Sequence, residues 1–402
     1  MVTLAEPPAL KVIRRAGRPE NDRTHSWVAP EEFFRNIRYV TIKVTNGCNL
    51  KCSYCNVDAD VPSTPRISME TYKRIADLLI KNSVHEEVGL EFHGGEPLIM
   101  PDEFFQEAVA YAADLAKKYG KKKVMHPMQT NATKLTEEKL EMLQGLGIDV
   151  GISCDGPPDI NDQFRMAGKR VEQALKMLVK RRSAFGMILV LSKGNCNHMY
   201  RIMEYFRELG VQGFRFNFLQ PQGLGMEHSL LSTEEMYAGV KGIFDHMADT
   251  ECSVVEANTQ MLVNRFAFGR NPSRPLSCWE LECQAGRTYC AVNLEGDVFS
   301  CGTDISKHRL GHIDDGFNQE NINSTLCGLH KKDAWYTKCF DCDAKRICSL
   351  SCPTSDFNDI RYRDSECGYT RAFFRYLTEN PEKVYSVLRG IGEKRPMGYF
   401  HL

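Results

Sequence analysis

The sequence predicts an α/β protein built as a partial (β/α)6 barrel of the TIM type, followed by a smaller cysteine-rich domain. Strand-like and helix-like segments alternate between about residues 39 and 250. After about residue 275 the helical periodicity fades, and cysteine, glycine and aspartate become frequent. The chain has 16 cysteines, many at short and repeated spacings. Because a segment with few apolar residues needs another source of stability, we expect bound metal to supply it there.

The first part of the chain reads as six strands, each followed by a helix. The strand-like segments are Tyr39–Val44, Val88–His93, Val124–Thr130, Ile148–Cys154, Gly186–Leu191 and Gly213–Phe218. The helical segments are Met69–Lys81, Glu103–Tyr119, Thr136–Leu146, Arg170–Arg182, His198–Leu209 and Thr233–Thr250. This alternation indicates a parallel sheet with helices outside it, which right-handed crossovers curl toward a barrel. Chemistry in such barrels sits in the loops at the C-terminal strand ends.

Five segments are expected along the chain. Residues 1–35 carry proline and arginine with little apolar periodicity, and we expect an extension or a lid. The other segments are a barrel at 36–250, a linker at 251–277, the cysteine-rich domain at 278–372 and a helical segment at 373–402. The last of these contains one expected helix, about Ala372–Arg389, that packs back on the body.

Composition excludes several classes of protein. The 402 residues are 42% hydrophobic and 26% charged, as in a globular protein of two or three domains. A net charge of −1 gives no global field for nucleic acid or a membrane surface. The chain has no apolar run long enough for a membrane span and no secretory signal. We therefore expect a cytoplasmic protein, in which clustered cysteines favour metal over disulfides.

The first cysteine cluster lies in the loop after the first strand. Cys48, Cys52 and Cys55 follow the spacing C-x3-C-x2-C. Three thiolates on one tight loop can hold three irons of a [4Fe–4S] cluster and leave the fourth iron open to a ligand. The competing metal is structural zinc, which wants four closed ligands. His93 or Cys154 would then have to lie close enough to provide the fourth.

The segment CNLKCSYC, with Tyr54 before its third cysteine, resembles the signature of the radical S-adenosylmethionine (SAM) superfamily. The resemblance implies that the open iron binds the amino and carboxylate groups of SAM, whose reductive cleavage gives a 5′-deoxyadenosyl radical that abstracts hydrogen. The second strand ends in HGGEP, which is similar to the GGEP motif that contacts the methionine amino group in that family. Gly94, Gly95, Glu96 and Pro97 are therefore expected at the cofactor, although a lone GGEP is also an ordinary turn.

Two later strand ends resemble segments of peptide- and protein-modifying members of this family. They are MQTNAT and SCDGPP. By that resemblance Gln129, Asn131, Ser153 and Asp155 face the cofactor or substrate, and Arg165 resembles an arginine that often follows. The alternative is that these polar residues only cap turns.

Eight later cysteines follow the pattern of the SPASM extension, in which two clusters are fully ligated. They are Cys283, Cys290, Cys301, Cys339, Cys342, Cys348, Cys352 and Cys367. Eight thiolates suit two [4Fe–4S] clusters. The resemblance, not the spacing, implies an interleaved assignment. The auxiliary cluster nearer the barrel takes Cys283, Cys290, Cys301 and Cys352, and the farther one takes Cys339, Cys342, Cys348 and Cys367. Zinc knuckles are the alternative for this region.

The resemblance covers about residues 36–370 and implies an oxidoreductase with three [4Fe–4S] clusters and SAM. Our first hypothesis is a maturase that forms an oxidative C–C or thioether cross-link in a ribosomally made precursor peptide. The second is a formylglycine maturase of sulfatases, or a small-molecule oxidoreductase. The third, from another class, is a zinc-stabilised binding protein without catalysis.

One residue argues against the sulfatase hypothesis. Formylglycine maturases carry an aspartate that acts as a base directly after the cysteine matching Cys301, and this chain has Gly302 at that position. Asp304 is the candidate base instead. The expected partners are a precursor peptide or protein substrate and a low-potential flavodoxin- or ferredoxin-like electron donor. A separate leader-binding protein is a further expected partner.

Overall fold

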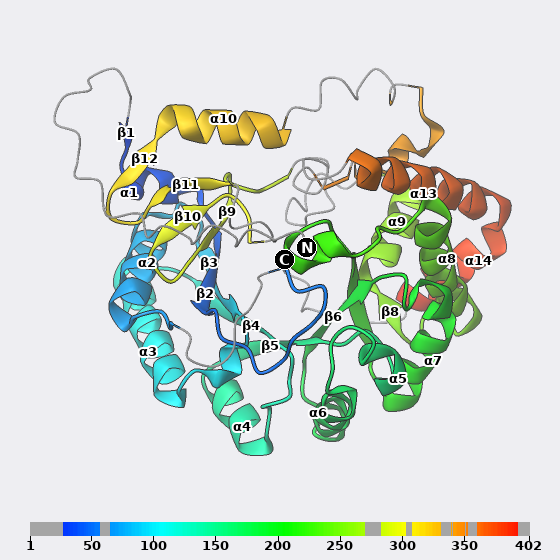
Figure 1. Ribbon diagram of the computed structural model, residues 1–402, viewed down its shortest axis with the longest axis horizontal. Coiled ribbons are helices and arrows are strands. Elements are labelled where there is room, and N and C mark those ends of the chain that lie inside the picture. The colour runs from blue at the N-terminus through cyan, green and yellow to red at the C-terminus, as the bar shows by residue number, and fades with distance from the viewer. Residues whose placement is uncertain are drawn as a thin grey trace, which may run out of the picture.

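The computed structural model describes residues 27–56, 65–269, 283–302, 308–330, 339, 341–349, 351–352 and 360–392. The described residues form a twelve-stranded sheet in the order β1-β12-β11-β10-β9-β2-β3-β4-β5-β6-β7-β8. Its parallel centre consists of β2 (Tyr39–Thr45), β3 (Glu87–Gly94), β4 (Lys123–Thr130), β5 (Ile148–Ser153), β6 (Gly186–Leu191) and β7 (Gly213–Phe218). The α/β fold with a partial barrel is therefore confirmed (Figure 1).

Helices cover the outside of the parallel strands in an arc (Figure 1). The main ones are α2 (Met69–Asn82), α3 (Asp102–Tyr119), α4 (Glu137–Gly145), α6 (Gly168–Lys180), α7 (Met199–Leu209) and α8 (Thr233–Asp249). Short turns lie between them at η2 (Pro97–Ile99), α5 (Pro158–Asn161), η3 (Cys196–His198) and η4 (Gly223–Glu227). The predicted helices are thus confirmed to within two residues at each end. No helix within the described ranges is long and apolar enough to cross a membrane.

The strands β2 and β3 are buried on both faces along most of their length, and the two faces of β2 differ in chemistry. On β2, Val40 and Ile42 belong to the hydrophobic core under the helices. The alternate residues Thr41 and Lys43 are also buried, each 2% exposed. Because successive side chains of a strand point to opposite faces, these polar residues point into the barrel. The part of the barrel interior that β2 forms is therefore polar.

The cysteine-rich region continues the same sheet. β9 (Tyr289–Val292) pairs parallel with β2, and its register places Cys290 beside Val40. Three further strands and the N-terminal one then pair antiparallel: β10 (Asp297–Phe299), β11 (Arg309–His312), β12 (Gly316–Asn318) and β1 (Trp27–Val28). Helix α10 (Gln319–His330) and the turn η5 (Asp343–Arg346) follow.

Three segments differ from their expected structure. The expected linker contains β8 (Val255–Glu256) and α9 (Ala257–Phe268). The expected final helix is split into α13 (Ile360–Glu379) and α14 (Pro381–Gly392). Proline disfavours a helical residue before it and starts a new helix well. The described end of the expected N-terminal extension is packed: α1 (Pro30–Phe33) and η1 (Phe34–Asn36) bury the Phe34 side chain completely.

Glu256 joins the unexpected helix α9 to the barrel. Its buried carboxylate accepts hydrogen bonds from the backbone N–H groups of Asn258 (3.0 Å), Thr259 (2.6 Å) and, on β7, Phe216 (3.0 Å). Burial raises the pKa of this carboxyl, and the three donors act against that rise.

We expect Glu256→Ala to lower the free energy of unfolding by about 3 kcal/mol, because buried N–H groups lose their acceptor. The measurement is the thermal unfolding midpoint, read by circular dichroism. Glu208→Ala, at an exposed position of α7, is the control and should change stability by less than about 0.5 kcal/mol. Equal midpoints for the two variants would contradict the role of Glu256.

Candidate active site

A cavity of about 960 Å³ lies inside the barrel, and its lining runs from the first residues of β2 and β4 to the loops at the C-terminal ends of the strands. Its walls include all three cysteines of the loop after β2 and six of the eight later cysteines. Those lining residues are Cys48, Cys52, Cys55, Cys283, Cys301, Cys339, Cys348, Cys352 and Cys367. Two cysteine regions that are far apart in the sequence therefore share one cavity.

The cysteine loop is held by two neighbouring loops of the barrel. The backbone N–H of Ser53 donates to the Phe164 carbonyl at 2.9 Å, in the loop after β5. In the loop after β7, the N–H of Leu224 donates to the Cys55 carbonyl at 2.9 Å. His228 Nε2 lies 2.8 Å from the Ser53 carbonyl. Burial raises the pKa of the Cys52 thiol to about 11, so binding of a metal by its thiolate must release a proton.

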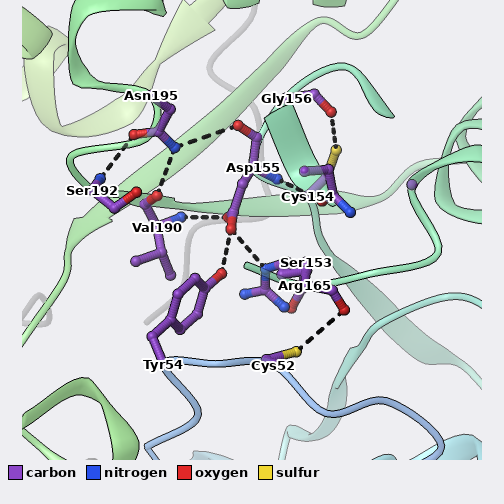
Figure 2. Close-up of polar contacts among 12 residues, drawn as sticks. Cys52, Tyr54, Ser153, Cys154, Asp155, Gly156, Arg165, Val190, Ser192 and Asn195 are labelled. Atoms are coloured by element: carbon purple, nitrogen blue, oxygen red, sulfur yellow. Dashed lines mark hydrogen bonds and ion pairs between the residues drawn. The ribbon is translucent and has the colours of Figure 1, made fainter. Parts of the chain in front are cut away.

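Asp155 is the centre of a buried polar network behind this loop (Figure 2). Its carboxylate accepts from the Tyr54 hydroxyl, from Arg165 Nε at 3.1 Å and from the Val190 N–H at 2.8 Å. The Arg165 guanidinium also lies 5.4 Å from the centre of the Tyr54 ring. Asn195 Nδ2 donates to the Asp155 carbonyl at 3.4 Å. Three residues expected from sequence, Tyr54, Asp155 and Arg165, therefore form one unit.

The glycines of the GGEP motif pack against the start of the cysteine loop. The N–H of Gly95 donates to the Thr45 carbonyl at 2.8 Å. Gly94 has a φ of +136°, which side chains rarely adopt, and a Cβ there would lie 2.2 Å from the Thr45 oxygen. A Cβ on Gly95 would lie 2.0 Å from the Gly47 oxygen. Both glycines line the cavity, and the close approach that requires them is to the backbone of this loop.

Glu96 supports a neighbouring loop. Its side chain is 1% exposed and accepts from the Thr130 hydroxyl at 2.5 Å and from the Asn131 N–H at 2.7 Å. Asn131 Nδ2 in turn lies 3.8 Å from Cys48 Sγ. Pro97 is buried at the start of η2. Glu96 and Pro97 are not among the described residues that line the cavity, and their place at the cofactor stays a prediction.

Gln129 and Ser153 occupy the wall itself. Gln129 Nε2 donates to Ser153 Oγ at 2.8 Å, and both side chains line the cavity. Contact of Gln129 and Ser153 with cofactor or substrate stays a prediction. The same holds for Gly94, Gly95 and Asn131.

The later cysteines lie on several elements around the cavity. Cys290 is fully buried on β9, Cys301 follows β10, and Cys367 is on α13. Burial raises the pKa of the Cys367 thiol, and the charges of Cys342 and Cys339 raise it further, so these three thiols are neighbours. That closeness agrees with their assignment to one cluster, which stays a prediction. Asp304 lies outside the described residues.

The two side chains considered as a fourth zinc ligand, His93 and Cys154, make other polar contacts. His93 Nδ1 accepts from the Gly94 N–H at 2.8 Å and lies 3.2 Å from Lys43 Nζ. The buried Cys154 thiol contacts the Gly156 carbonyl at 3.4 Å. Across the part of the chain that the structure describes, no three Cys, His, Asp or Glu side chains have the geometry to hold one metal ion. Thiols spread around a wall suit a cluster of several irons better than a single zinc.

Sequence reasoning missed a row of polar side chains inside the barrel. Thr41 donates to Glu91 Oε2, and its hydroxyl lies 2.7 Å from the Tyr289 hydroxyl. Lys43 is paired with His93 across the strands. Burial lowers the pKa of Lys43 to about 8, although the charges of Glu91, Cys55 and Cys301 act to raise it. The signal in the sequence is polar residues at every second position of two otherwise apolar strands.

Comparison with known proteins shows what this chain is similar to. Residues 42–212 match the model of the Radical SAM superfamily. The chain is 25% identical over 374 residues to the serine-type anaerobic sulfatase-maturating enzyme of Bacteroides thetaiotaomicron, covering 84% of this chain and 88% of that protein. It is 24% identical over 370 residues to a cysteine-type enzyme of Clostridium perfringens, covering 83% and 94%. The subtilosin biosynthesis protein AlbA of Bacillus subtilis is 29% identical over 196 residues, covering 47% and 41%.

Solved structures share the fold. The structure of anSMEcpe with bound AdoMet and Cp18Cys peptide has a TM-score of 0.68 and 21% identity, covering 89% of this chain and 99% of that one. Streptococcus suis SuiB bound to the precursor peptide SuiA has a TM-score of 0.57 and 15% identity, covering 79% and 72%. At these identities the likeness establishes the fold.

We expect Asp155→Ala to destabilise the chain by about 3–5 kcal/mol, because it leaves the buried Arg165 guanidinium without its carboxylate. The measurement is the anaerobic thermal unfolding midpoint, together with iron bound per chain. Asp159→Ala is the matched control, because the Asp159–Arg201 pair is about 60% exposed on both sides and should contribute less than about 1 kcal/mol. If both variants melt alike and keep their iron, Asp155 does not hold the cysteine loop.

Proposed function

We propose that this chain, whose residues 42–212 form a radical SAM domain, is an enzyme that oxidises a side chain of a peptide or protein substrate. The single observation that carries the proposal is the shared cavity. The thiols of the signature loop and those of the later cysteine region line the same space, which has room for a cofactor and part of a substrate.

The cysteine loop fits the catalytic cluster. Cys48, Cys52 and Cys55 line the cavity beside the tightly packed Gly94 and Gly95. They would hold a [4Fe–4S] cluster with one open iron, and SAM would bind there. Reductive cleavage of SAM at such a cluster supplies a hydrogen-abstracting radical, for which a low-potential flavodoxin- or ferredoxin-like protein is the proposed electron source. The chain's own part is to place the substrate C–H bond and to exclude water.

The later cysteines would hold two further clusters of the SPASM type. Full ligation by four thiolates leaves each cluster without an open iron. Their proposed role is therefore electron transfer. An oxidative reaction releases electrons from the substrate, and a cluster at the cavity wall gives them a way out.

Gly302 favours cross-linking over formylglycine formation. A Cβ at this position would lie 2.8 Å from the Tyr289 hydroxyl, so no acidic side chain fits there unless Tyr289 moves. The proposed product is therefore an oxidative C–C or thioether link in a ribosomally made peptide, with any leader bound by the barrel or a separate protein. Formylglycine formation is the second candidate, because the sulfatase-maturating relatives match over most of their length.

We expect about twelve irons per chain after anaerobic reconstitution, and 5′-deoxyadenosine on addition of dithionite and SAM. The matched variants replace the Cys48, Cys52 and Cys55 set, or the Cys339, Cys342 and Cys367 set, by alanine. Each should lose about four irons, but only the first should abolish 5′-deoxyadenosine formation. Zinc in place of iron, with no cleavage of SAM, would establish the binding-protein alternative instead.

Substrate class is tested by mass spectrometry of two kinds of peptide. We expect a peptide encoded beside the gene, coexpressed with this chain, to lose two hydrogen atoms and to show linked fragments. The Cp18Cys peptide, bound to anSMEcpe in its solved structure, should stay unmodified. Conversion of its cysteine to an aldehyde would support the sulfatase candidate and contradict cross-linking.

A further inference from the structure

A buried carboxylate faces the cavity and has no part in holding a cluster. Glu91 lies on β3 and is 5% exposed, and it lines the cavity together with Thr41, Tyr289 and Gly302. The Oε2 atom of Glu91 accepts a hydrogen bond from the Thr41 hydroxyl. The Oε1 atom accepts no hydrogen bond from any residue that the structure describes. One carboxylate oxygen is therefore fixed and the other is available to a molecule in the cavity.

The hydrogen bonds on the Oε2 side of the Glu91 carboxylate run in a defined direction. A threonine hydroxyl has one proton, and Thr41 gives it to Glu91. The Tyr289 hydroxyl, 2.7 Å away, must then donate to Thr41. The Tyr289 hydroxyl also occupies the space beside Gly302, since a Cβ on residue 302 would lie 2.8 Å from it. The row Tyr289–Thr41–Glu91 thus connects the wall beside Cys301 to the carboxylate.

We propose that Glu91 is the proton acceptor of the oxidation, with Thr41 and Tyr289 as the residues that position it. This inference rests on the proposed function. When a side chain X–H becomes linked to a carbon that bore hydrogen, the substrate loses one hydrogen atom, one further electron and one proton. The hydrogen atom leaves with the radical derived from SAM. The electron goes to an iron–sulfur cluster at the cavity wall. The X–H bond breaks as the new bond forms, and its proton goes to Glu91 Oε1.

The surroundings make Glu91 a stronger base than an exposed glutamate. Burial raises the pKa of Glu91, while the Thr41 hydrogen bond and the Lys43 charge lower it. Tyr39 and Lys43 face it from β2 and Tyr289 from β9, and His93 lies on its own strand. On the other side, β4 contributes Met125 and Pro127 to the wall, and neither titrates. A base is most effective when its pKa lies near the working pH.

The test compares Glu91→Gln, which keeps size and can still accept from Thr41, with Glu87→Gln on the same strand. Glu87 is exposed and pairs with Arg38 at the surface. In the reconstituted protein, infrared difference titration should show a carboxyl band with a midpoint above the usual range of a glutamate side chain, because burial raises the pKa of Glu91. That band should disappear in Glu91→Gln and persist in Glu87→Gln. A Glu91 band with its midpoint inside or below the usual range overturns the proposal.

The second measurement uses the peptide that the unmodified chain oxidises. Glu91→Gln should keep its iron and form 5′-deoxyadenosine, while oxidised product per 5′-deoxyadenosine falls about 100-fold or more. Glu91→Asp should recover part of the product, with a shifted pH profile. An unchanged yield of oxidised product in Glu91→Gln overturns the proposal. Loss of iron along with product in that variant also overturns it. So does loss of product in Asp304→Asn when Glu91→Gln keeps its product. If the unmodified chain oxidises no peptide, the proposed function fails, while the infrared titration still decides the state of Glu91.

Discussion

The buried pair of Asp155 and Arg165 is the interaction on which the arrangement of the site depends. Residues 48–56 of the cysteine loop form no helix or strand, so the shape of this described part must come from its neighbours. Asp155 provides much of that shape, because its carboxylate accepts hydrogen bonds from Tyr54 in the cysteine loop, from Arg165 in the loop after β5 and from the backbone of β6. A charged pair at this depth is costly to bury and is tolerated only when its remaining hydrogen bonds are made. The network meets that condition.

The features that sequence predicted well are those with a local signal. The strand Gly186–Leu191 and the helix α8 follow from apolar periodicity, and in the structure the Ser232 side chain caps α8. The cysteine clusters also have a local signal, in the short spacing of their thiols, and their roles as cluster ligands stay a prediction. Glu96 shows the limit, because a motif names a residue without saying which way its side chain points. Its carboxylate binds the loop after β4.

Other features depend on contacts across long stretches of chain. The helix α9 was expected as linker, because its cap, Glu256, is a buried glutamate held by β7 rather than a common capping residue. Glu91 was missed for a related reason. A lone glutamate in an apolar strand reads as a surface residue, and its burial becomes visible only when Thr41 and Tyr289 lie beside it. Sequence order places Tyr289 far from both.

The parallel pairing of β9 with β2 has a consequence for how the protein is made. β2 is among the first strands to leave the ribosome, whereas its second neighbour comes from the last third of the chain. Until β9 arrives, a growing barrel presents β2 as an open sheet edge, which readily pairs with other chains. The barrel cannot close that edge with its own strands. Synthesis at least as far as β9 is therefore a condition for a stable fold, and a chain that ends before β9 should aggregate rather than persist as an isolated barrel.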